Sequence, residues 1–394
     1  MRRSAWLSWT SWWKPPKTQL FVLVAVFAVA SCKPGSSNFN ITQFISNYGY
    51  AVENYTATTE DGYYLDFFRI FKGRNGNAPS KGPIVVGHGF LSSADQFVIG
   101  GPEQGLGFIL SDYGYDVYLV NFRGSVYGRR HTRLNPQRDP AFWNFGVQEI
   151  GTKDLPALLD RIKEISGSGS FKYVGHMEGS QYFFVMASEK PEYGKYFTGV
   201  GVLGPVAFLG HTRSRIMKNI ADNVDSKAFI MKHVGMNQFN PSQELLEDSR
   251  SDCRRSTSNS QICDNVYFLL YGYEDDHYNK TIVDAALHHF PAGASVRQIL
   301  HHAYSVRSGR FEKYDQDWNS KGEYDLSKIN MPVTVFYTPY DGMAYRDDVY
   351  MLMDQLPKVK HQKMYLELES NADFIFARNV RETVYEYLMR FLDE

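Results

Sequence analysis

Residues 171–179 (FKYVGHMEG) combine a buried-strand pattern with a turn that could present a reactive side chain. The apolar run predicts a strand, Gly175 and Gly179 flank the turn, and the residues from Ser180 onward predict a helix. This is the layout of a nucleophile elbow, G-x-S-x-G, in which a serine sits exposed on a strained turn. Met177 stands at the central position, and a thioether has no proton to give up. The stretch therefore predicts the geometry of acyl transfer without its nucleophile.

A second turn predicts a site for a negatively charged oxygen. Residues 83–91 (PIVVGHGFL) read as an apolar strand that ends in a glycine-bracketed turn. Such a turn can aim the backbone N–H of Phe90 at an oxyanion, and the backbone N–H of Glu178 would be the second donor. Backbone donors survive side-chain changes, so this pocket could outlast the nucleophile. The alternative is a turn with no such role, and His88 is expected to be structural.

Strands and helices alternate along most of the chain, which predicts an α/β fold with a mostly parallel central sheet flanked by helices. The first two strands form a hairpin around a tight turn of sequence EDG. The predicted helices are residues 41–48 and 154–165, the hairpin is 51–70, and the further strands are 115–124, 200–206, 331–337 and 363–368.

The pattern changes between residues 207 and 306, where helical segments and scattered charges replace the strands. We interpret this stretch as an inserted, mainly helical cap. The core is then built in two parts, residues 33–206 and 307–394. Cys253 and Cys263 lie close together within the cap and predict a disulfide in an oxidising compartment.

The N-terminus resembles a targeting segment. Basic residues precede an uncharged apolar run at 20–30, which is too short to span a bilayer comfortably but suits a secretory signal peptide. Residues 1–32 are therefore predicted to be a signal peptide, and the protein to be secreted or lysosomal or otherwise lumenal. The alternative is an N-terminal anchor helix, because the long leading stretch holds four tryptophans at positions 6, 9, 12 and 13.

Composition and glycosylation patterns fit this setting. A formal net charge of −1 over 394 residues leaves no electrostatic argument for nucleic acid, so no nucleic-acid partner is expected. The 27 Tyr and 27 Phe are assigned to a large core by default. Asn40, Asn54 and Asn279 open N-x-T tripeptides, which predict glycosylation sites in a secreted chain.

Several stretches in the same order resemble the acid lipase family of α/β-hydrolases, which includes the gastric and lysosomal acid lipases and their insect relatives. They are residues 48–63, 88–91 (HGFL), 114–124 and 290–296 (FPAGASV). The resemblance covers nearly all of the mature sequence. It implies an α/β-hydrolase fold whose cap covers the site, and hydrolysis of triacylglycerols and steryl esters by a Ser-His-Asp triad. It implies no metal and no cofactor.

The triad carries over only in part. The family's nucleophile is the middle residue of G-H-S-Q-G, where Met177 stands, and its acid follows a strand, where Asp341 stands. The family's base opens an H-x-D-F motif, and here Asn371 takes that position. An amide cannot shuttle a proton near neutral pH. Ser180 lies past the turn and His176 before it, so neither is a good substitute.

Magnitudes favour an inactive homologue. A kcat on the order of 10 s⁻¹, reduced by roughly 10⁶ when a triad nucleophile is lost, leaves about one turnover per day. We therefore predict a secreted, acid-lipase-like protein of lipid metabolism that binds a lipid or fatty acyl ligand, or a protein partner. Two alternatives remain: a working triacylglycerol or steryl ester lipase, and a secreted storage or interaction scaffold.

Overall fold

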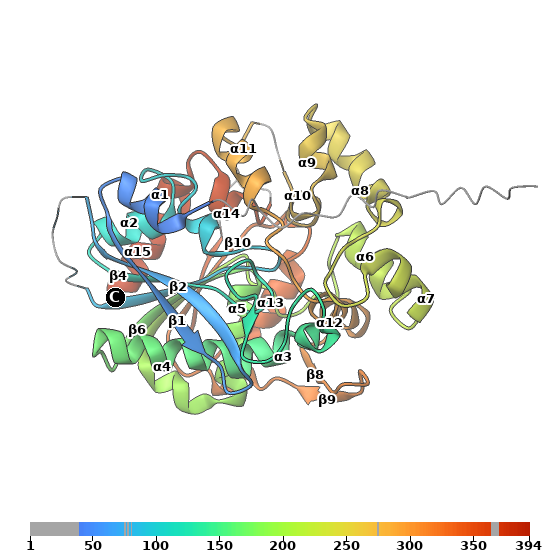
Figure 1. The fold of residues 1–394 in the computed structure, drawn as a ribbon, viewed down its shortest axis with the longest axis horizontal. Helices are drawn as coiled ribbons and strands as arrows, with labels where there is room; N and C mark the ends of the chain where they lie inside the picture. Colours follow the sequence, from blue (N-terminus) through green and yellow to red (C-terminus); the bar gives the residue numbers. More distant parts are fainter. Residues whose placement is uncertain (1–38, 75, 77–78, 80, 274–275, 364–369) are drawn as a thin grey trace, which may run out of the picture. The chain divides into compact units, whose positions relative to one another are not determined.

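The central layer of the protein is a mixed sheet with a parallel majority (Figure 1). This computed structural model describes residues 39–394 except 75, 77–78, 80, 274–275 and 364–369. Among the described residues the sheet has nine strands in the order β1-β2-β4-β3-β6-β7-β10-β11, with β5 paired to β2. The bounds are β1 Ala51–Thr58, β2 Tyr63–Lys72, β3 Pro83–Gly87, β4 Asp116–Val120, β5 Arg130–His131, β6 Phe171–His176, β7 Phe197–Leu203, β10 Val333–Tyr337 and β11 Val359–Lys363.

Strand direction follows the connections. The predicted hairpin is confirmed, because β1 and β2 pair antiparallel around a turn at residues 59–62, and β2 is also antiparallel to β4. From β4 to β11 every neighbouring pair is parallel. Strands β3, β4 and β10 are buried along their whole length, as expected of parallel strands covered on both faces. The predicted α/β class and mostly parallel sheet are confirmed.

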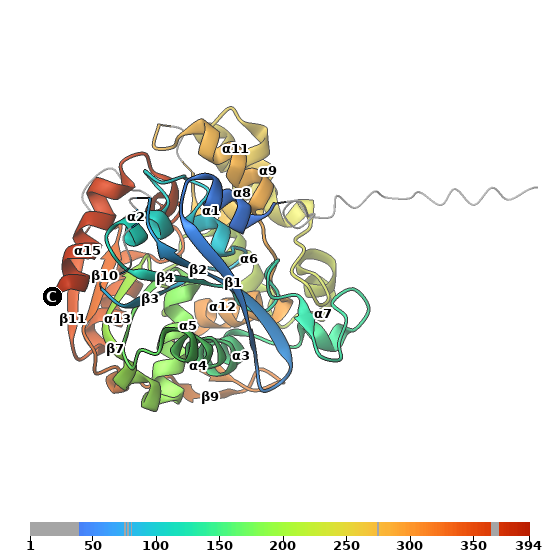
Figure 2. The same ribbon diagram turned by 60° about the vertical axis from the view of Figure 1, so that its left-hand side comes forward.

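Helices cover both faces of the sheet (Figures 1 and 2). Tyr173 of β6 stacks on Phe183 of α5, whereas the next residue, Val174, faces the opposite side with Gly201 of β7. On that opposite side α15 brings Leu388 against Gly201. The helices of these layers are α1 Ile41–Asn47, α2 Leu106–Asp112, α3 Val147–Glu149, α4 Leu155–Ser166, α5 Glu178–Glu189, α13 Arg346–Gln355, α14 Asp373–Phe376 and α15 Glu386–Asp393.

The stretch from 207 to 306 adds helices and, in the part that the structure describes, no strand of the central sheet. Serine and asparagine side chains cap these helices by accepting a backbone N–H, so the polar residues scattered through this sequence mark where helices begin. The helices are α6 Arg215–Asp222, α7 Lys227–Phe229, α8 Gln243–Ser256, α9 Ser260–Asp264, α10 Val266–Tyr271, α11 Lys280–His289 and α12 Val296–Ser308. In both views α8, α9 and α11 lie together on the side away from α4.

The predicted disulfide is confirmed. Cys253 of α8 bonds to Cys263 of α9, with the sulfurs 2.00 Å and the Cα atoms 5.5 Å apart. The bond ties two helices that are connected by only a few residues.

Some boundaries differ from expectation. The helix expected from Ser180 begins at Glu178, and the strand expected at 200–206 is found at Phe197–Leu203. Most of the strand expected at 363–368 lies outside the described residues, as does the predicted signal peptide at 1–32. Within the described ranges no helix has both the length and the apolar character needed to cross a membrane.

Candidate active site

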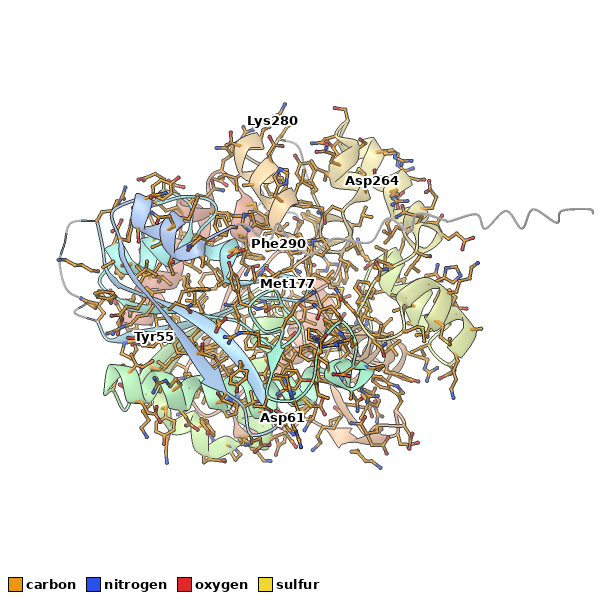
Figure 3. All side chains as sticks on the ribbon, viewed as in Figure 1. Tyr55, Asp61, Met177, Asp264, Lys280 and Phe290 are labelled. Atoms are coloured by element: carbon orange, nitrogen blue, oxygen red, sulfur yellow. A yellow bond between two sulfur atoms is a disulfide. The ribbon has the colours of Figure 1, made fainter. Side chains whose placement is uncertain are left out.

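Met177 occupies the apex of a sharp strand-to-helix turn. It lies between β6 and α5 with φ 52° and ψ −117°, a region that a residue other than glycine enters only under strain. Its backbone N–H donates to the carbonyl oxygen of Leu203 at 3.0 Å, which fixes the turn against the end of β7. The side chain is fully buried, and Figure 3 labels it near the middle of the view. The turn has the geometry of a nucleophile elbow.

The two glycines of the turn are required by close backbone packing. A Cβ added at Gly175 would lie 2.6 Å from the backbone nitrogen of Ser180. A Cβ added at Gly179 would lie 2.2 Å from the carbonyl oxygen of Gly87. The Ser180 hydroxyl is buried and donates to the carbonyl oxygen of Gly175 at 2.9 Å, so this serine holds the turn together and is not exposed for attack.

Asp341, which the sequence predicts to be the triad acid, follows β10 in the chain. Its Oδ1 accepts the backbone N–H groups of Met343 and Ala344 at 2.7 and 2.8 Å, while its Oδ2 has no hydrogen-bond partner. Burial raises the pKa of Asp341 from 3.8 to about 7, against the lowering effect of the two backbone donors. The nearby carboxyl groups of Asp373 and Glu178 raise it further.

Asn371 is the residue predicted to stand at the position of the base, and its side chain makes no hydrogen bond. Both the Oδ1 and the Nδ2 are buried without a partner, so the amide bridges neither to Asp341 nor to Met177. Its backbone oxygen accepts from the Nε2 of His176 at 3.0 Å. Its Oδ1 packs against Gly204, where an added Cβ would lie 1.6 Å away. Met177 and Asn371 therefore meet the same end of β7, at Leu203 and Gly204.

The expected oxyanion donor is present but already engaged. The backbone N–H of Phe90 donates to Oε2 of the Glu178 side chain at 2.7 Å. The Tyr271 hydroxyl donates to the Phe90 carbonyl oxygen at 2.7 Å and lies 3.2 Å from the same Oε2. The sequence predicted a role for the backbone N–H of Glu178 but did not predict this contact of its side chain. The available signal was an acidic residue directly after the elbow position.

Glu178 is a buried carboxyl group without a charged partner in contact. Burial raises the pKa of Glu178 from 4.5 to about 7, although the backbone N–H groups of Phe90 and Glu178 itself and the Tyr271 hydroxyl lower it. The Nε2 of His302 is 3.9 Å from Oε1, but it is hydrogen-bonded to Gln181 at 3.0 Å. Burial lowers the pKa of His302 to about 3, so this ring is neutral.

The other histidines near the elbow serve the fold. The Nδ1 of His88 is 2.8 Å from the carbonyl oxygen of Gly89, and its Nε2 accepts the backbone N–H of Phe122 at 3.3 Å. Burial lowers the pKa of both His88 and His176 to about 4. Neither ring is placed to act on a group at Met177. Over the described ranges no set of three or more His, Cys, Asp or Glu side chains is arranged to hold a metal ion.

A pocket of about 360 Å³ lies beside the buried site. Gly342 and Ser370, which are neighbours of Asp341 and Asn371 in sequence, form part of its wall. The apolar part of the wall comes from α10 and nearby aromatic rings. These residues are Phe268, Leu269, Leu270, Tyr273 and Tyr340.

The three predicted glycosylation sites are exposed at the surface. Asn40 and Asn279 also cap α1 and α11 through their side-chain oxygens, which accept the backbone N–H groups of Gln43 and Thr281 at 3.0 Å. Asn54 lies on β1 with its side chain exposed. Glycosylation of these residues stays a prediction.

Comparison with known proteins agrees with the geometry of the fold. Residues 41–101 match the model of the partial alpha/beta-hydrolase lipase region, and residues 82–376 match that of the alpha/beta hydrolase fold. Human gastric triacylglycerol lipase is 31% identical over 381 residues, covering 92% of this chain and 93% of that protein. Lipase 1 of Drosophila melanogaster is 30% identical over 366 residues, covering 90% of this chain and 80% of the relative.

Solved structures show the same fold at low identity. An esterase from Exiguobacterium antarcticum superposes with a TM-score of 0.52 at 13% identity, over 87% of this chain and all of that one. An esterase from Rhodococcus sp. ECU1013 gives a TM-score of 0.51 at 12% identity, over 86% of this chain and 98% of that one. The assignment to a family rests on the 30–31% sequence identity to the two lipases over nearly the whole chain. The chain belongs to the acid lipase family of α/β-hydrolases.

Proposed function

We propose that this lipase homologue no longer hydrolyses esters through an acyl-enzyme and that its site serves to bind a lipid. The observation that carries the proposal is Met177 at the apex of an intact elbow. The backbone geometry that presents a nucleophile is kept, while the side chain at that point has no nucleophilic oxygen. Asn371 at the position of the base adds an independent obstacle, because its amide has no pKa in the working range and no hydrogen bond to Asp341.

Residual hydrolysis by another group finds little support in the geometry. Ser180 donates its proton to a backbone oxygen inside the turn, and His88 and His176 are neutral and held by backbone groups. Glu178 is buried against the donor that an oxyanion would need. A serine hydrolase that loses its nucleophile loses roughly 10⁶ in kcat, which leaves no useful turnover.

The pocket beside the site supports a lipid ligand. Its volume of about 360 Å³ falls in the range of small-molecule sites, and its wall combines apolar α10 side chains and aromatic rings with the charged side chains of Arg213, Arg215 and Asp252. In this proposal the helical stretch 207–306 acts as the cap, because Tyr271 of α10 contacts both Phe90 and Glu178 at the core. The proposal includes secretion or delivery to a lumenal compartment, which the disulfide and the exposed glycosylation tripeptides support.

The test uses the full-length protein secreted from eukaryotic cells. We expect no labelling by a fluorophosphonate and short-chain ester turnover no faster than in buffer, whereas an active relative of the family is labelled and turns over. We expect mass spectrometry of the extract to show lipid bound to the protein. Steady turnover with covalent labelling of the unmodified chain would contradict the loss of hydrolysis.

A matched pair of variants tests the pocket. Leu269→Arg places a charge in the apolar part of the wall, which α10 supplies, and is expected to abolish lipid retention. Met231→Arg makes the same change at a side chain that is 57% exposed elsewhere in the cap stretch, and lipid retention should be unchanged. Protein without lipid in both the unmodified and variant forms would favour a storage or interaction scaffold instead.

A further inference from the structure

We propose that the Glu178 side chain fills the oxyanion hole of this protein, so that the site is closed by its own chain as well as deprived of its catalytic residues. The inference rests on the proposed function. It goes beyond that function because the side chain that obstructs the oxyanion hole is not a member of the triad.

The position of Glu178 Oε2 matches that of a reacting oxygen. Oxyanion donors act at 2.7–3.1 Å from the oxygen they stabilise, as a rule of such sites. The backbone N–H of Phe90 lies 2.7 Å from Oε2. One of the two donors expected for an ester oxygen is therefore already directed at this carboxyl group.

Packing holds the carboxyl group in place. Glu178 has no exposed surface, and a Cβ added at Gly89 would lie 3.0 Å from Oε2. The Tyr271 hydroxyl closes the other side at 3.2 Å from this oxygen. Because Tyr271 belongs to α10, moving Glu178 out of the hole would disturb the contact between the cap stretch and the elbow.

Occupation of the hole has a predictable effect on catalytic rescue. A carbonyl oxygen that gains negative charge would find its donor engaged and a carboxyl group in its place. Removing a single oxyanion donor from a serine hydrolase costs about 10²–10³ in kcat. The double variant Met177→Ser with Asn371→His should therefore remain slower than a complete site by a factor of this size.

The experiment adds Glu178→Ala or Glu178→Gln to the Met177→Ser, Asn371→His double variant. The alanine removes the side chain and keeps the backbone donor, while the glutamine keeps the size and removes the charge. We expect the alanine variant to raise short-chain ester turnover and the rate of fluorophosphonate labelling by about 10²-fold over the double variant. The glutamine variant should give a smaller rise, because its amide oxygen can still accept from Phe90.

Glu189→Ala in the same double variant is the matched control. Glu189 is the last residue of α5 and is bonded to Lys313 at 3.1 Å, far along the helix from the elbow. It should leave turnover at the level of the double variant. Thermal melting establishes which variants are folded, and either Glu178 variant alone can decide the question.

The outcomes separate this inference from the proposed function. Labelling of the unmodified protein would overturn the proposed function. A double variant that already matches an active relative would overturn the inference alone, and so would folded Glu178 variants no faster than the double variant. As a measurement independent of rescue, Glu178→Ala in the unmodified chain removes the acceptor and should shift the ¹⁵N–¹H resonance of Phe90, and Glu189→Ala should not. An unmoved Phe90 resonance would also overturn the inference.

Discussion

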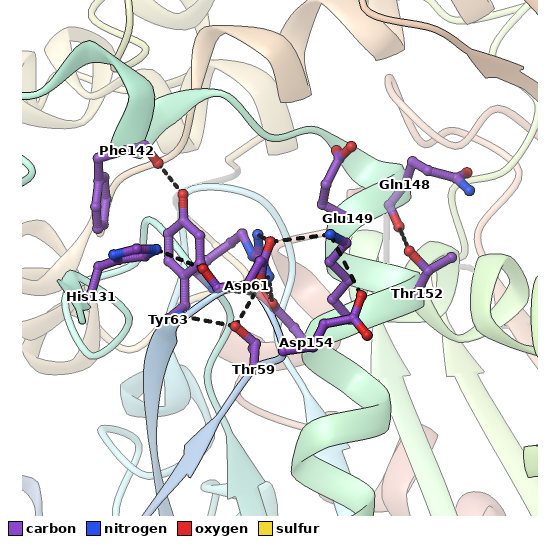
Figure 4. A network of polar contacts seen from close by, with 12 residues as sticks. Thr59, Asp61, Tyr63, His131, Phe142, Gln148, Glu149, Thr152 and Asp154 are labelled. Carbon is purple, nitrogen blue, oxygen red and sulfur yellow. Dashed lines mark hydrogen bonds and ion pairs between the residues drawn. The ribbon is translucent and has the colours of Figure 1, made fainter. Parts of the chain in front are cut away.

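Two buried polar regions of this protein differ in how completely their groups are paired. The first surrounds Arg123, just beyond the end of β4, and Figure 4 labels Asp61, Tyr63 and Asp154 of its network of contacts. The guanidinium group donates to Asp154 at 2.6 Å and to both oxygens of Asp61 at 2.8 and 2.9 Å. The backbone N–H of Arg123 donates to Asp154 at 2.9 Å, and the Tyr63 ring lies 3.9 Å from the guanidinium carbon. In this region each charge meets an opposite one.

The second region surrounds the elbow, beyond the end of β6, and many of its buried polar atoms have no hydrogen-bond partner. They lie around the predicted triad positions. They are Oε1 of Glu178, Oδ2 of Asp341, both side-chain polar atoms of Asn371, the Tyr267 hydroxyl and Nδ1 of His302. A buried polar group left unpaired costs about 1–3 kcal/mol. The unpaired atoms of the elbow region therefore lower the free energy of unfolding, whereas the Arg123 network pairs its charges.

This difference in pairing distinguishes polar side chains that stabilise the fold from polar side chains of the candidate site. Loss of one member of a buried ion network leaves a buried charge without its partner and strongly destabilises the fold, so the members of the network constrain one another. Buried polar groups without partners are uncommon in folded proteins, so their concentration around the elbow marks a region that the fold alone does not explain. The comparison predicts that replacing a polar side chain by an apolar one lowers the free energy of unfolding in the Arg123 network and leaves it unchanged or raises it in the elbow region.

The largest expected effect comes from breaking the Arg123 network. Arg123→Met leaves the fully buried Asp154 without its cation and should lower the free energy of unfolding by about 3–5 kcal/mol. Arg130→Met removes the cation of the Arg130–Asp66 pair, in which the arginine side chain is 58% exposed, and should cost about 0–1 kcal/mol. Urea unfolding measures both. Equal losses in the free energy of unfolding would show that the buried network stabilises the fold no more than the exposed pair does.

Protonation of the elbow carboxyl group gives the next effect. Burial raises the pKa of Glu178 from 4.5 to about 7, so between these pH values the folded chain holds a proton that the unfolded chain has released. The stability contributed by this proton is present below pH 4.5 and is lost as the pH rises to about 7. A shift of this size corresponds to on the order of 3 kcal/mol. Glu178→Gln should therefore gain stability relative to the unmodified protein as the pH rises.

The measurement is urea unfolding of the two proteins at pH 4.5 and pH 8. Groups common to both, including Asp341 with its raised pKa, titrate in each protein and largely cancel in the difference. Glu189→Gln is the control, because that residue is paired with Lys313 near the surface. A difference between Glu178→Gln and the unmodified protein that is the same at both pH values would contradict the prediction.

The backbone of the site could be predicted from the sequence because local rules determine it. Gly175 and Gly179 at fixed spacing specify a tight strand-to-helix turn, and the EDG turn at 60–62 specifies the hairpin. Cys253 and Cys263 lie ten residues apart, which made their disulfide predictable. Each of these features depends on residues that are near one another in the chain.

The side-chain contacts of the site could not be predicted in the same way. The bond from Phe90 to Glu178 joins residues 88 positions apart, and it depends on how closely two turns approach. The unpaired amide of Asn371 likewise depends on its packing against Gly204. The resemblance to acid lipases supplied the triad positions. The family motifs have a glutamine at the position of Glu178 and a histidine at the position of Asn371, so they could not predict the contacts of these two side chains.

The smallest expected effects compare two fully buried asparagines, Asn371 of the elbow region and Asn121, which lies two residues before Arg123. Asn121 accepts the backbone N–H of Ala94 at 2.8 Å and donates to the carbonyl oxygen of Asp66 at 2.9 Å, so Asn121→Leu leaves two backbone groups unpaired and should cost about 2–3 kcal/mol. Asn371 makes no such bonds, and Asn371→Leu keeps its shape while removing two unpaired atoms, so stability should stay within about 1 kcal/mol or rise. Urea unfolding at one pH decides between these outcomes. If both changes cost the same, the unpaired amide is contributing to the fold, and the contrast between the two regions does not hold at the level of single side chains.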